Sequence, residues 1–270
     1  EFRRVLFRSW GIYGLVWIGA LAWVRVIKPF LLLQKPYLVD QVIPERGNSW
    51  TLVLKPDRHK GFRFQPGQFA WITAWDTPFR DSEHPFSLSG SAEDTSRFCF
   101  TIKALGDFTS KIKDLQPGQR VYVDGPYGSF SVDRHTHAKG FVFIAGGIGI
   151  TPMMSMLRTL ADRGDKRPLT LIYANKNLEG VTFLEEIETL PARLNLKVVH
   201  VLENPPQNWA GETGFVTVDI LKRHLPADYQ PNVYEIFICG PAPMMNAVEK
   251  ALTQINISAG DFHSERFDLV

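Results

Sequence analysis

The chain has 270 residues, of which 44% are hydrophobic and 21% charged, so it is an ordinary folded protein long enough for two globular domains. Its formal net charge of +2 gives no basis for nucleic-acid binding. The only two cysteines, Cys99 and Cys239, exclude a four-cysteine zinc or iron–sulfur site within the chain. They also provide no disulfide framework, which favours a reducing compartment.

The chain opens with a segment that fits none of the patterns after it. We interpret residues 1–9, EFRRVLFRS, as translated sequencing-adaptor or vector sequence, so that the natural protein was longer and this chain is its C-terminal part. Residues 10–24 then form an uncharged run, followed by Arg25 and Lys28. We predict that residues 10–34 are the end of a transmembrane helix whose basic end lies at the cytoplasmic interface. An amphipathic or core helix is the alternative.

Residues 35–130 are predicted to form an antiparallel β-barrel. Short strand-like runs such as SWTLVLKP, FAWITAW and FCFTIKAL are separated by Gly and Pro, and Arg46-Gly47-Asn48 marks a turn. One helix is expected inside the barrel, over residues 107–115. Residues 131–139 are polar and predict a linker. We interpret His135 and His137 there as part of a solvated loop rather than a metal site, because two histidines without a fixed carboxylate or cysteine nearby are far more often solvated.

From residue 140 to residue 270, strand-like and helix-like segments alternate. LTLIYAN, LKVVHVL and VYEIFIC are rich in β-formers, whereas PMMSMLRTLADR, TFLEEIETL and PMMNAVEKALTQI have helical spacing. This alternation predicts a doubly wound parallel sheet with helices on both faces. The methionines at the helix starts are expected to pack in the core.

The strongest single pattern joins a buried strand to a helix in residues 141–157, FVFIAGGIGITPMMSML. Gly146, Gly147 and Gly149 lie in the turn, where free N–H groups and the positive end of the helix dipole can meet a diphosphate. Pro152 stands where the third glycine of G-x-G-x-x-G would be, so this is not the ordinary Rossmann fingerprint. We predict a diphosphate-binding turn, with a ligand-free tight turn as the alternative.

Four further stretches complete the pattern: EHPFSLS at 83–89, IKALGDFT at 102–109, FICGP at 237–241 and ERF at 265–267. Together the five resemble the ferredoxin–NADP reductase superfamily, over residues 37–270. The resemblance is strongest to its ferric reductase and NADPH oxidase branch, in which the dehydrogenase module follows a haem-bearing membrane bundle. Soluble members begin the flavin motif with Arg, whereas this chain has His84. The usual salt bridge to the diphosphate is therefore replaced by hydrogen bonds from an imidazole.

The resemblance implies a role for each motif. For FAD it implies stacking by Phe86 and a hydroxyl from Ser87 near flavin N5, with Lys103, Gly106 and Thr109 at the diphosphate and ribose. The remaining FAD-site residues are His84, Pro85, Ile102 and Phe108. For the nicotinamide nucleotide it implies Gly146, Gly147, Gly149, Thr151, Pro152, Asn175, Gly240, Pro241 and Met244. Cys239 and Glu265 are expected to flank the nicotinamide, and Phe267 to cover the other face of the flavin. Cys239 has a serious alternative as a buried strand residue, and no resident metal is expected.

The function implied is transfer of a hydride from NADPH or NADH to FAD, then of electrons to a haem in the missing upstream membrane part, and finally to ferric iron or oxygen. A modest NADPH preference is predicted, because Asn175 and Lys176 follow a strand without an acidic partner for a ribose 2′-hydroxyl; Arg158, Arg163 and Lys166 are further basic candidates. Two other functions stay open: a soluble-type flavin reductase serving a separate ferredoxin or oxygenase, and a non-catalytic nucleotide-binding scaffold. Location at the cell membrane, with the dehydrogenase domains on the cytoplasmic side, follows from the predicted helix.

Overall fold

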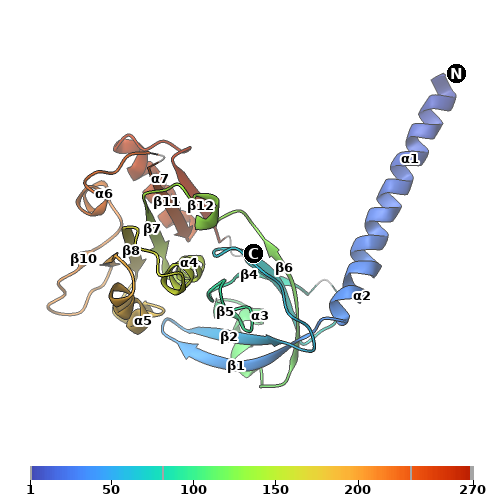
Figure 1. Cartoon of the computed structure of the whole chain (residues 1–270), viewed down its shortest axis with the longest axis horizontal. Helices are drawn as coiled ribbons and strands as arrows, with labels where there is room; N and C mark the ends of the chain where they lie inside the picture. Colours follow the sequence, from blue (N-terminus) through green and yellow to red (C-terminus); the bar gives the residue numbers. More distant parts are fainter. Residues whose placement is uncertain (1, 81, 232, 268–270) are drawn as a thin grey trace.

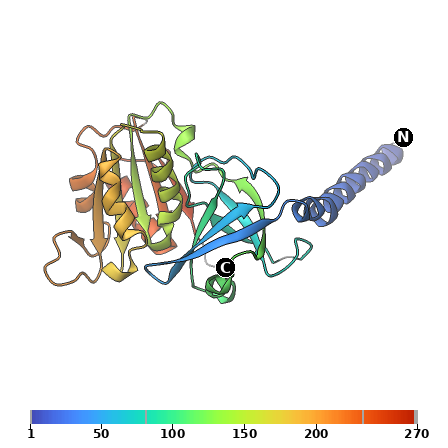
Figure 2. The ribbon, with the colours of Figure 1, turned by 60° about the horizontal axis from the view of Figure 1, so that its bottom comes forward.

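The structure combines two packed domains with a helix that projects away from them (Figures 1 and 2). It is a computed structural model that describes residues 2–80, 82–231 and 233–267, with side chains from residue 10 onward. One domain holds a six-stranded antiparallel sheet and the other a six-stranded parallel sheet. The predicted fold class, a β-barrel followed by a doubly wound α/β domain, is therefore confirmed.

The projecting helix is a continuous rod made of α1 (Phe2–Ala22), a π-helical turn η1 (Trp23–Ile27) and α2 (Lys28–Leu33). Pro29 has no N–H to donate to the carbonyl four residues earlier, and the helix widens into the π turn just ahead of it. Among the described residues, one helical segment, Trp10–Leu33, is long and apolar enough to cross a membrane, with a mean hydropathy of 1.7. The predicted apolar helix is thus present.

The rod is attached to the first domain through its C-terminal end. Lys28 forms an ion pair with Asp124 of β6, and Pro29 is buried at the junction. Beyond this junction the large apolar side chains of the rod are exposed, among them Trp10, Leu15 and Trp17. The apolar surface therefore extends away from a helix end that is fixed to the barrel.

The first domain is an antiparallel barrel whose strands lie in the order β4-β3-β6-β1-β2-β5. These strands are β1 (Tyr37–Glu45), β2 (Ser49–Pro56), β3 (Phe69–Ala74), β4 (His84–Ser87), β5 (Phe98–Lys103) and β6 (Arg120–Tyr127). A bridge between Leu88 and Phe100 connects the two ends of the sheet. Apolar residues of alternate positions fill the interior, with Leu52, Leu54 and Phe98 fully buried.

Two short segments differ from their predicted form. The single helix expected over 107–115 is divided into α3 (Asp107–Ser110) and a 3-10 turn η2 (Ile112–Asp114), and the division turns Ile112 into the barrel core. The segment 131–139 was expected to be a solvated linker. Instead it contains a 3-10 turn, η3 (Val132–Arg134), in which Val132 is buried, and His135 is half-buried. The solvated-loop prediction holds for His137 and is wrong for His135.

The second domain is a parallel sheet with helices on both faces, in the order β10-β9-β8-β7-β11-β12. Its strands are β7 (Gly140–Gly146), β8 (Leu169–Asn175), β9 (Leu196–Leu202), β10 (Glu212–Thr213), β11 (Tyr234–Gly240) and β12 (Phe262–Arg266). Its helices are α4 (Ile150–Asp162), α5 (Leu184–Thr189), α6 (Val218–His224) and α7 (Ala242–Gln254), with 3-10 turns η4 (Gly147–Gly149), η5 (Leu178–Gly180) and η6 (Leu190–Ala192). Each face has its own hydrophobic core. The predicted methionines pack there: Met153, Met154, Met156 and Met245 are fully buried.

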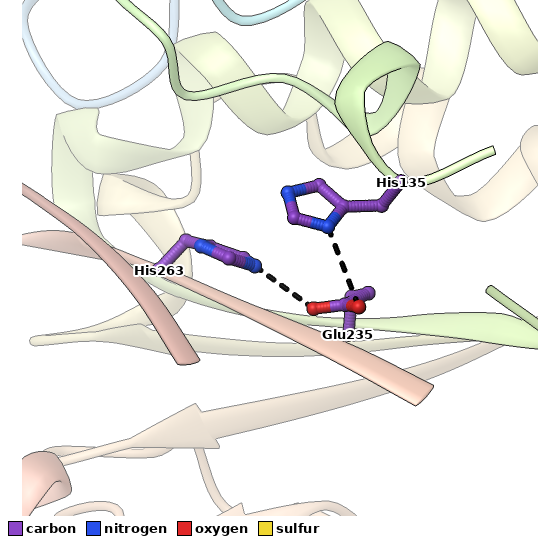
Figure 3. A group of neighbouring side chains, drawn as sticks. All are labelled: His135, Glu235 and His263. Atoms are coloured by element: carbon purple, nitrogen blue, oxygen red, sulfur yellow. Dashed lines mark hydrogen bonds and ion pairs between the residues drawn. The ribbon is translucent and has the colours of Figure 1, made fainter. Parts of the chain in front are cut away.

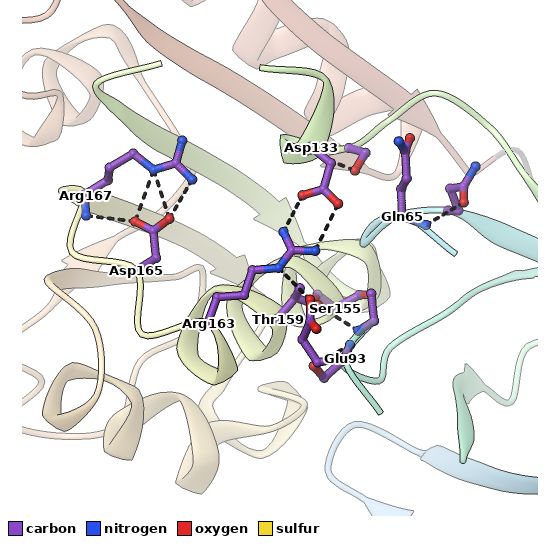
Figure 4. A network of polar contacts seen from close by, with 12 residues as sticks. Gln65, Glu93, Asp133, Ser155, Thr159, Arg163, Asp165 and Arg167 are labelled. Carbon is purple, nitrogen blue, oxygen red and sulfur yellow. Dashed lines mark hydrogen bonds and ion pairs between the residues drawn. The ribbon is translucent and has the colours of Figure 1, made fainter. Parts of the chain in front are cut away.

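Helix α4 joins the two domains through polar contacts (Figure 4). Arg163 near its C-terminal end donates to Glu93 of the barrel domain at 2.6 Å and to both carboxylate oxygens of Asp133, at 2.6 and 3.1 Å. One and two turns earlier, Thr159 accepts a hydrogen bond from the N–H of Ala92 at 2.9 Å, and Ser155 donates to the carbonyl of Gly90 at 2.8 Å. These contacts therefore fix the position of the barrel relative to α4, the helix that starts at the glycine turn.

Candidate active site

The main cavity lies where the barrel meets the C-terminal strand of the α/β domain, and it has a volume of about 790 Å³. Both domains contribute to its wall. The lining residues are Phe69, His84, Pro85, Phe86, Ser87, Thr101, Ile102, Lys103, Leu105, Gly106, Asp107, Phe108, Thr109, Ile148, Thr151, Glu265, Arg266 and Phe267. The structure thus brings together three stretches that are far apart in the sequence: HPFS, GDFT and ERF.

An aromatic cluster forms the barrel side of the cavity. The rings of Phe86 and Phe108 are stacked, with centroids 5.9 Å apart and an interplanar angle of 17°. His84 lies against Phe108 at 4.0 Å, and Trp75 meets it edge-on at 5.4 Å. Partial burial lowers the pKa of His84, so its imidazole is neutral near pH 7 and offers one N–H donor. This agrees with the expected loss of a permanent positive charge at the first motif position.

Two buried polar atoms in the cavity wall have no hydrogen-bond partner among the described residues. These are the Ser87 hydroxyl, which is 5% exposed, and Oε2 of Glu265. A buried polar atom without a partner is costly and points to a group that is bound there. Burial also raises the pKa of Glu265 to about 7, so near neutral pH this carboxyl exchanges a proton easily.

Cys239 lies behind Glu265 rather than in the cavity wall. The two residues are register partners on the parallel strands β11 and β12. Cys239 is fully buried in the core that packs α4, and burial together with the Glu265 carboxylate raises the pKa of its thiol well above the usual range. Cys239 is therefore surrounded as the alternative interpretation, a buried strand residue, expects. Its thiol is not activated as a nucleophile.

The glycines of the turn after β7 differ in what lies beside them. A Cβ on Gly149 would lie 2.3 Å from the carbonyl oxygen of Cys239, and one on Gly146 would lie 2.7 Å from the sulfur of Met244. Gly149 is therefore required for close packing between the turn and the backbone of β11, whereas Gly146 and Gly240 lie against the flexible side chain of Met244. Gly147 of the turn, with φ +52°, has open space beside it. The role of the three glycines at a nucleotide diphosphate stays a prediction.

Neighbouring side chains hold this turn in place. The Tyr173 hydroxyl donates to the carbonyl of Gly147 at 3.0 Å, and Thr151 donates to the carbonyl of Ile148 at 3.1 Å. Thr151 still lines the cavity, whereas Pro152 is buried in the first turn of α4, where its missing N–H leaves no helical bond unmade. The N–H of Ile150, at the start of this turn, donates to the carbonyls of Gly147 and Ile148.

The second anion-binding stretch, at 106–109, is closed by its own side chain. Thr109 accepts hydrogen bonds from the N–H groups of Leu105 and Gly106, both at 2.9 Å, and donates to the Gly106 carbonyl at 3.1 Å. Its hydroxyl therefore shapes the turn, and Thr109 also lines the cavity, so its expected role at the diphosphate and ribose stays a prediction. Gly106 has open space beside it and Lys103 lines the cavity, so these two keep their expected position.

The remaining predicted residues lie outside the cavity wall. Asn175 is buried at the end of β8, with its amide nitrogen unpartnered among the described residues, and Met244 is half-buried against Gly146. Pro241 precedes α7 as its N-cap. They stand on the same carboxyl edge of the sheet as the glycine turn, which is where nucleotides bind in open α/β sheets.

Two of the basic candidates for a 2′-phosphate are committed elsewhere. Arg158 donates to Glu186 at 2.7 Å and to the Ser89 carbonyl at 2.6 Å, and Arg163 is the interdomain contact described above. Lys166 follows the C-terminal end of α4, whereas the glycine turn precedes its N-terminal end. Both arginines are thus paired with carboxylates from α5 and from the other domain, and Lys166 lies at the far end of α4 from the glycine turn. Lys176 is exposed at the carboxyl end of β8 and keeps its predicted place.

Several lining residues were not predicted. Phe69 and Thr101 point inward from barrel strands, and Ile148 and Arg266 stand next to predicted residues. Adjacency to Glu265 was a usable signal for Arg266. Phe69 had no comparable signal, because an apolar strand residue is more often part of a core.

Comparisons with known proteins agree with this geometry. Residues 46–131 match the family described as FAD-binding domain, and residues 143–250 match the family described as oxidoreductase NAD-binding domain. The NADH-cytochrome b5 reductase 2 of Phaeosphaeria nodorum is 31% identical over 232 residues, covering 81% of this chain and 65% of that protein. The NADH-cytochrome b5 reductase 2 of Neurospora crassa is 35% identical over 148 residues, covering 53% of this chain and 42% of that protein. The matched regions thus span 42% to 65% of these curated relatives.

Solved structures share the two-domain fold. The FAD/NAD-binding domain of a nitric oxide dioxygenase from Vibrio cholerae superposes with a TM-score of 0.73 at 22% identity, covering 86% of this chain and 98% of that one. The cytochrome b5 reductase domain of Ulva prolifera nitrate reductase gives the same TM-score and identity, covering 85% and 96%. Cavity, fold and both family matches agree: the chain carries a domain that matches the FAD-binding family and a domain that matches the oxidoreductase NAD-binding family, arranged in the two-domain fold of these solved structures.

Proposed function

We propose that this chain is an NAD(P)H dehydrogenase module that passes electrons through FAD to a haem acceptor at a membrane. The observation that carries the proposal is the pair of unpartnered groups, Ser87 Oγ and Glu265 Oε2, in one cavity built from both domains. Such a pair has little use in a rigid scaffold, because each unpaired buried group destabilises the fold. It suits a site where a ring carrying polar atoms is bound and protons are exchanged.

The residues present fit FAD. Phe86 and Phe108 offer an aromatic surface for a planar ring system, and the Ser87 hydroxyl offers a hydrogen bond to one ring atom. The open side of Gly106 and the ammonium group of Lys103 suit a diphosphate. FAD, when bound, supplies the acceptance of a hydride from the nicotinamide nucleotide and the later release of electrons one at a time.

The protein's own contribution is orientation, exclusion of water and control of one proton. Ser87 is positioned to orient the bound ring through its hydroxyl. Glu265, with a pKa of about 7, is positioned to hold or release a proton beside the nicotinamide. Phe267 lines the cavity next to it and occupies space that a nicotinamide needs. Cys239 fills the core behind the carboxyl group and sets how deeply that group lies.

The acceptor we favour is a haem in a membrane segment upstream in the same protein, with ferric iron or oxygen as the final acceptor. The support is the apolar segment Trp10–Leu33, which continues without a flexible linker into a helix end fixed by Lys28 and Pro29. Arg25 and Lys28 at that end favour a cytoplasmic position for the two domains. A fixed junction of this kind keeps the barrel at one distance from the membrane.

A second acceptor, a separate cytochrome b5-type protein, is favoured by the relatives, which are named as NADH-cytochrome b5 reductases. The names of the relatives favour NADH, whereas exposed Lys176 suits the 2′-phosphate of NADPH.

Rapid mixing of the FAD-loaded chain with NADH or NADPH, without oxygen, tests the proposal. We expect bleaching of the flavin band, and slower bleaching in Ser87→Ala than in the wild type or in the control Ser96→Ala, which alters an exposed loop. Full FAD loading without bleaching by either nucleotide would refute the dehydrogenase. Adding soluble cytochrome b5 to the reduced protein then separates the two acceptors, because fast oxidation by cytochrome b5 supports the separate partner.

A further inference from the structure

A compact cluster of two histidines and one carboxylate lies outside the cavity (Figure 3). Nε2 of His263 is 2.9 Å from one carboxylate oxygen of Glu235, and Nδ1 of His135 is 3.3 Å from the other. The two imidazole rings lie with their centroids 4.2 Å apart. All three side chains are half-buried, so they are sheltered but not sealed from solvent. The cluster joins the interdomain segment 131–139 to β11 and β12.

The fold fixes this arrangement. Phe237 of β11 is the register partner of His263 of β12, and alternate residues of a strand face the same side, so Glu235 and His263 point to one face of the sheet. His135 reaches that face from the turn after η3, with its ring edge-on to Phe237 at 5.8 Å. Three separate segments therefore present one nitrogen or oxygen atom each to a common point, and these atoms lie within 4.8 Å of one another.

Hydrogen bonding alone accounts for only half of the cluster. The His263–Glu235 contact is a good hydrogen bond, but the 3.3 Å separation of His135 and Glu235 is longer than the ~2.7–2.9 Å of a charge-assisted one. Two imidazoles at this separation, tilted by 39° to each other, also repel each other when both are protonated. Without a ligand, the site therefore leaves one imidazole poorly paired.

We infer that His135, Glu235 and His263 bind a divalent transition-metal ion of the Zn²⁺ class. Two imidazoles and a carboxylate are a known donor set for such ions, at metal–ligand distances of ~2.0–2.2 Å, with a further position left to water. Donor atoms around a tetrahedral ion of this size lie ~3.3–3.5 Å apart. Small side-chain rotations therefore complete the site. The ion ties segment 131–139 to β12, the strand that continues to Glu265 and Phe267.

Calorimetric titration of the FAD-loaded, chelator-washed chain with Zn²⁺ tests this inference. We expect one ion per chain, and at least ~100-fold weaker binding in His263→Gln and in His135→Gln. His137→Gln is the matched control, because His137 is an exposed histidine on the same loop outside the cluster. It should bind Zn²⁺ as the wild type does. Normal FAD loading and melting without metal show that each variant is folded.

Two results would overturn the inference. One is wild-type binding no tighter than that of folded His135→Gln or His263→Gln. The other is loss of binding in His137→Gln with retention in His263→Gln, which would assign the ion to surface histidines. If one cluster variant fails to load FAD, the other decides, because His135 stands on a loop and His263 on a strand. As a second readout, Zn²⁺ should raise the melting temperature of the wild type and of His137→Gln only.

Discussion

The carboxyl group of Glu265 makes stability depend on pH in an unusual direction. Its pKa is raised from 4.5 to about 7 by burial, so the folded protein without bound cofactors binds this proton more tightly than the unfolded chain does. The stabilisation is fully present below pH 4.5 and is lost as pH rises through 7. A shift of this size corresponds to about 3 kcal/mol in total, of which about 2 kcal/mol is lost between pH 5.5 and pH 8.

Denaturant unfolding of the FAD-free chain and of Glu265→Gln, at intervals across this pH range, measures the effect. Glutamine has a similar shape and no titration, so the stability of the variant relative to the wild type should increase by about 2 kcal/mol from pH 5.5 to pH 8. Glu203→Gln is the control, because Glu203 is exposed, and its curve should follow the wild type. Parallel curves for wild type and Glu265→Gln would show that the carboxyl group titrates at an ordinary pKa, which would remove it from the proton-handling role.

Three further predictions follow from the site and the domain interface. Phe86→Ala should weaken FAD binding about 3- to 10-fold in a fluorescence titration, because an aromatic pair contributes ~0.5–1.5 kcal/mol. The control Phe215→Ala alters an exposed ring and should leave FAD affinity unchanged. Equal FAD affinities of Phe86→Ala and the wild type would remove the stacking role. The ratio of kcat/KM values should favour NADPH by less than tenfold and fall in Lys176→Ala; a tenfold preference for NADH contradicts this. Arg158→Met should lower the free energy of unfolding by ~1–2 kcal/mol, because it removes the ion pair with partly exposed Glu186 and the hydrogen bond to the Ser89 carbonyl of the barrel domain. The control Arg193→Met removes an exposed ion pair and should cost a few tenths of a kcal/mol. Equal losses in the two variants would deny Arg158 an interdomain role.

Local patterns in the sequence predicted the parts of the fold that depend on neighbouring residues. The strand, glycine turn and helix of residues 141–157 are found as β7, η4 and α4, and the turn at Gly47 and Asn48 joins β1 to β2. Helix α6 and strand β12 were not predicted. Strand β12 has only five residues, of which four, HSER, are polar and do not favour a strand. It is a strand because it pairs with β11.

The finer points of the site depended on contacts that a sequence does not display. Gly146 and Gly149 are visible as glycines, but only the structure shows that Gly149 packs against the backbone of β11 and Gly146 against Met244. The Thr109 hydroxyl is a second example. A threonine at a helix start can hydrogen-bond either to the backbone of its own turn or to a ligand, and the structure shows the backbone contacts. His135 was interpreted as solvated because its carboxylate partner, Glu235, is a hundred residues away along the chain.

Phe267 is predicted to control entry of the nicotinamide. Its ring lines the cavity beside Glu265 and also packs partly on the core around α4, so both the gate and the plain packing role are compatible with its position. A ring that must move before the nicotinamide binds weakens nucleotide binding by the cost of its displacement. Phe267→Ser should therefore tighten NADP⁺ binding and slow product release, which lowers kcat and KM together.

The control for that experiment is Phe262→Ser, five residues earlier at the start of β12 and packed on the opposite core. It should lose stability and leave NADP⁺ affinity unchanged. Flavin difference spectra give the affinity, and steady-state rates give kcat and KM, for the wild type and both variants. If Phe267→Ser changes only the melting temperature, as Phe262→Ser does, then Phe267 is a packing residue and nicotinamide entry is limited by another group, with Thr151 and Ile148 on the facing wall as the next to vary.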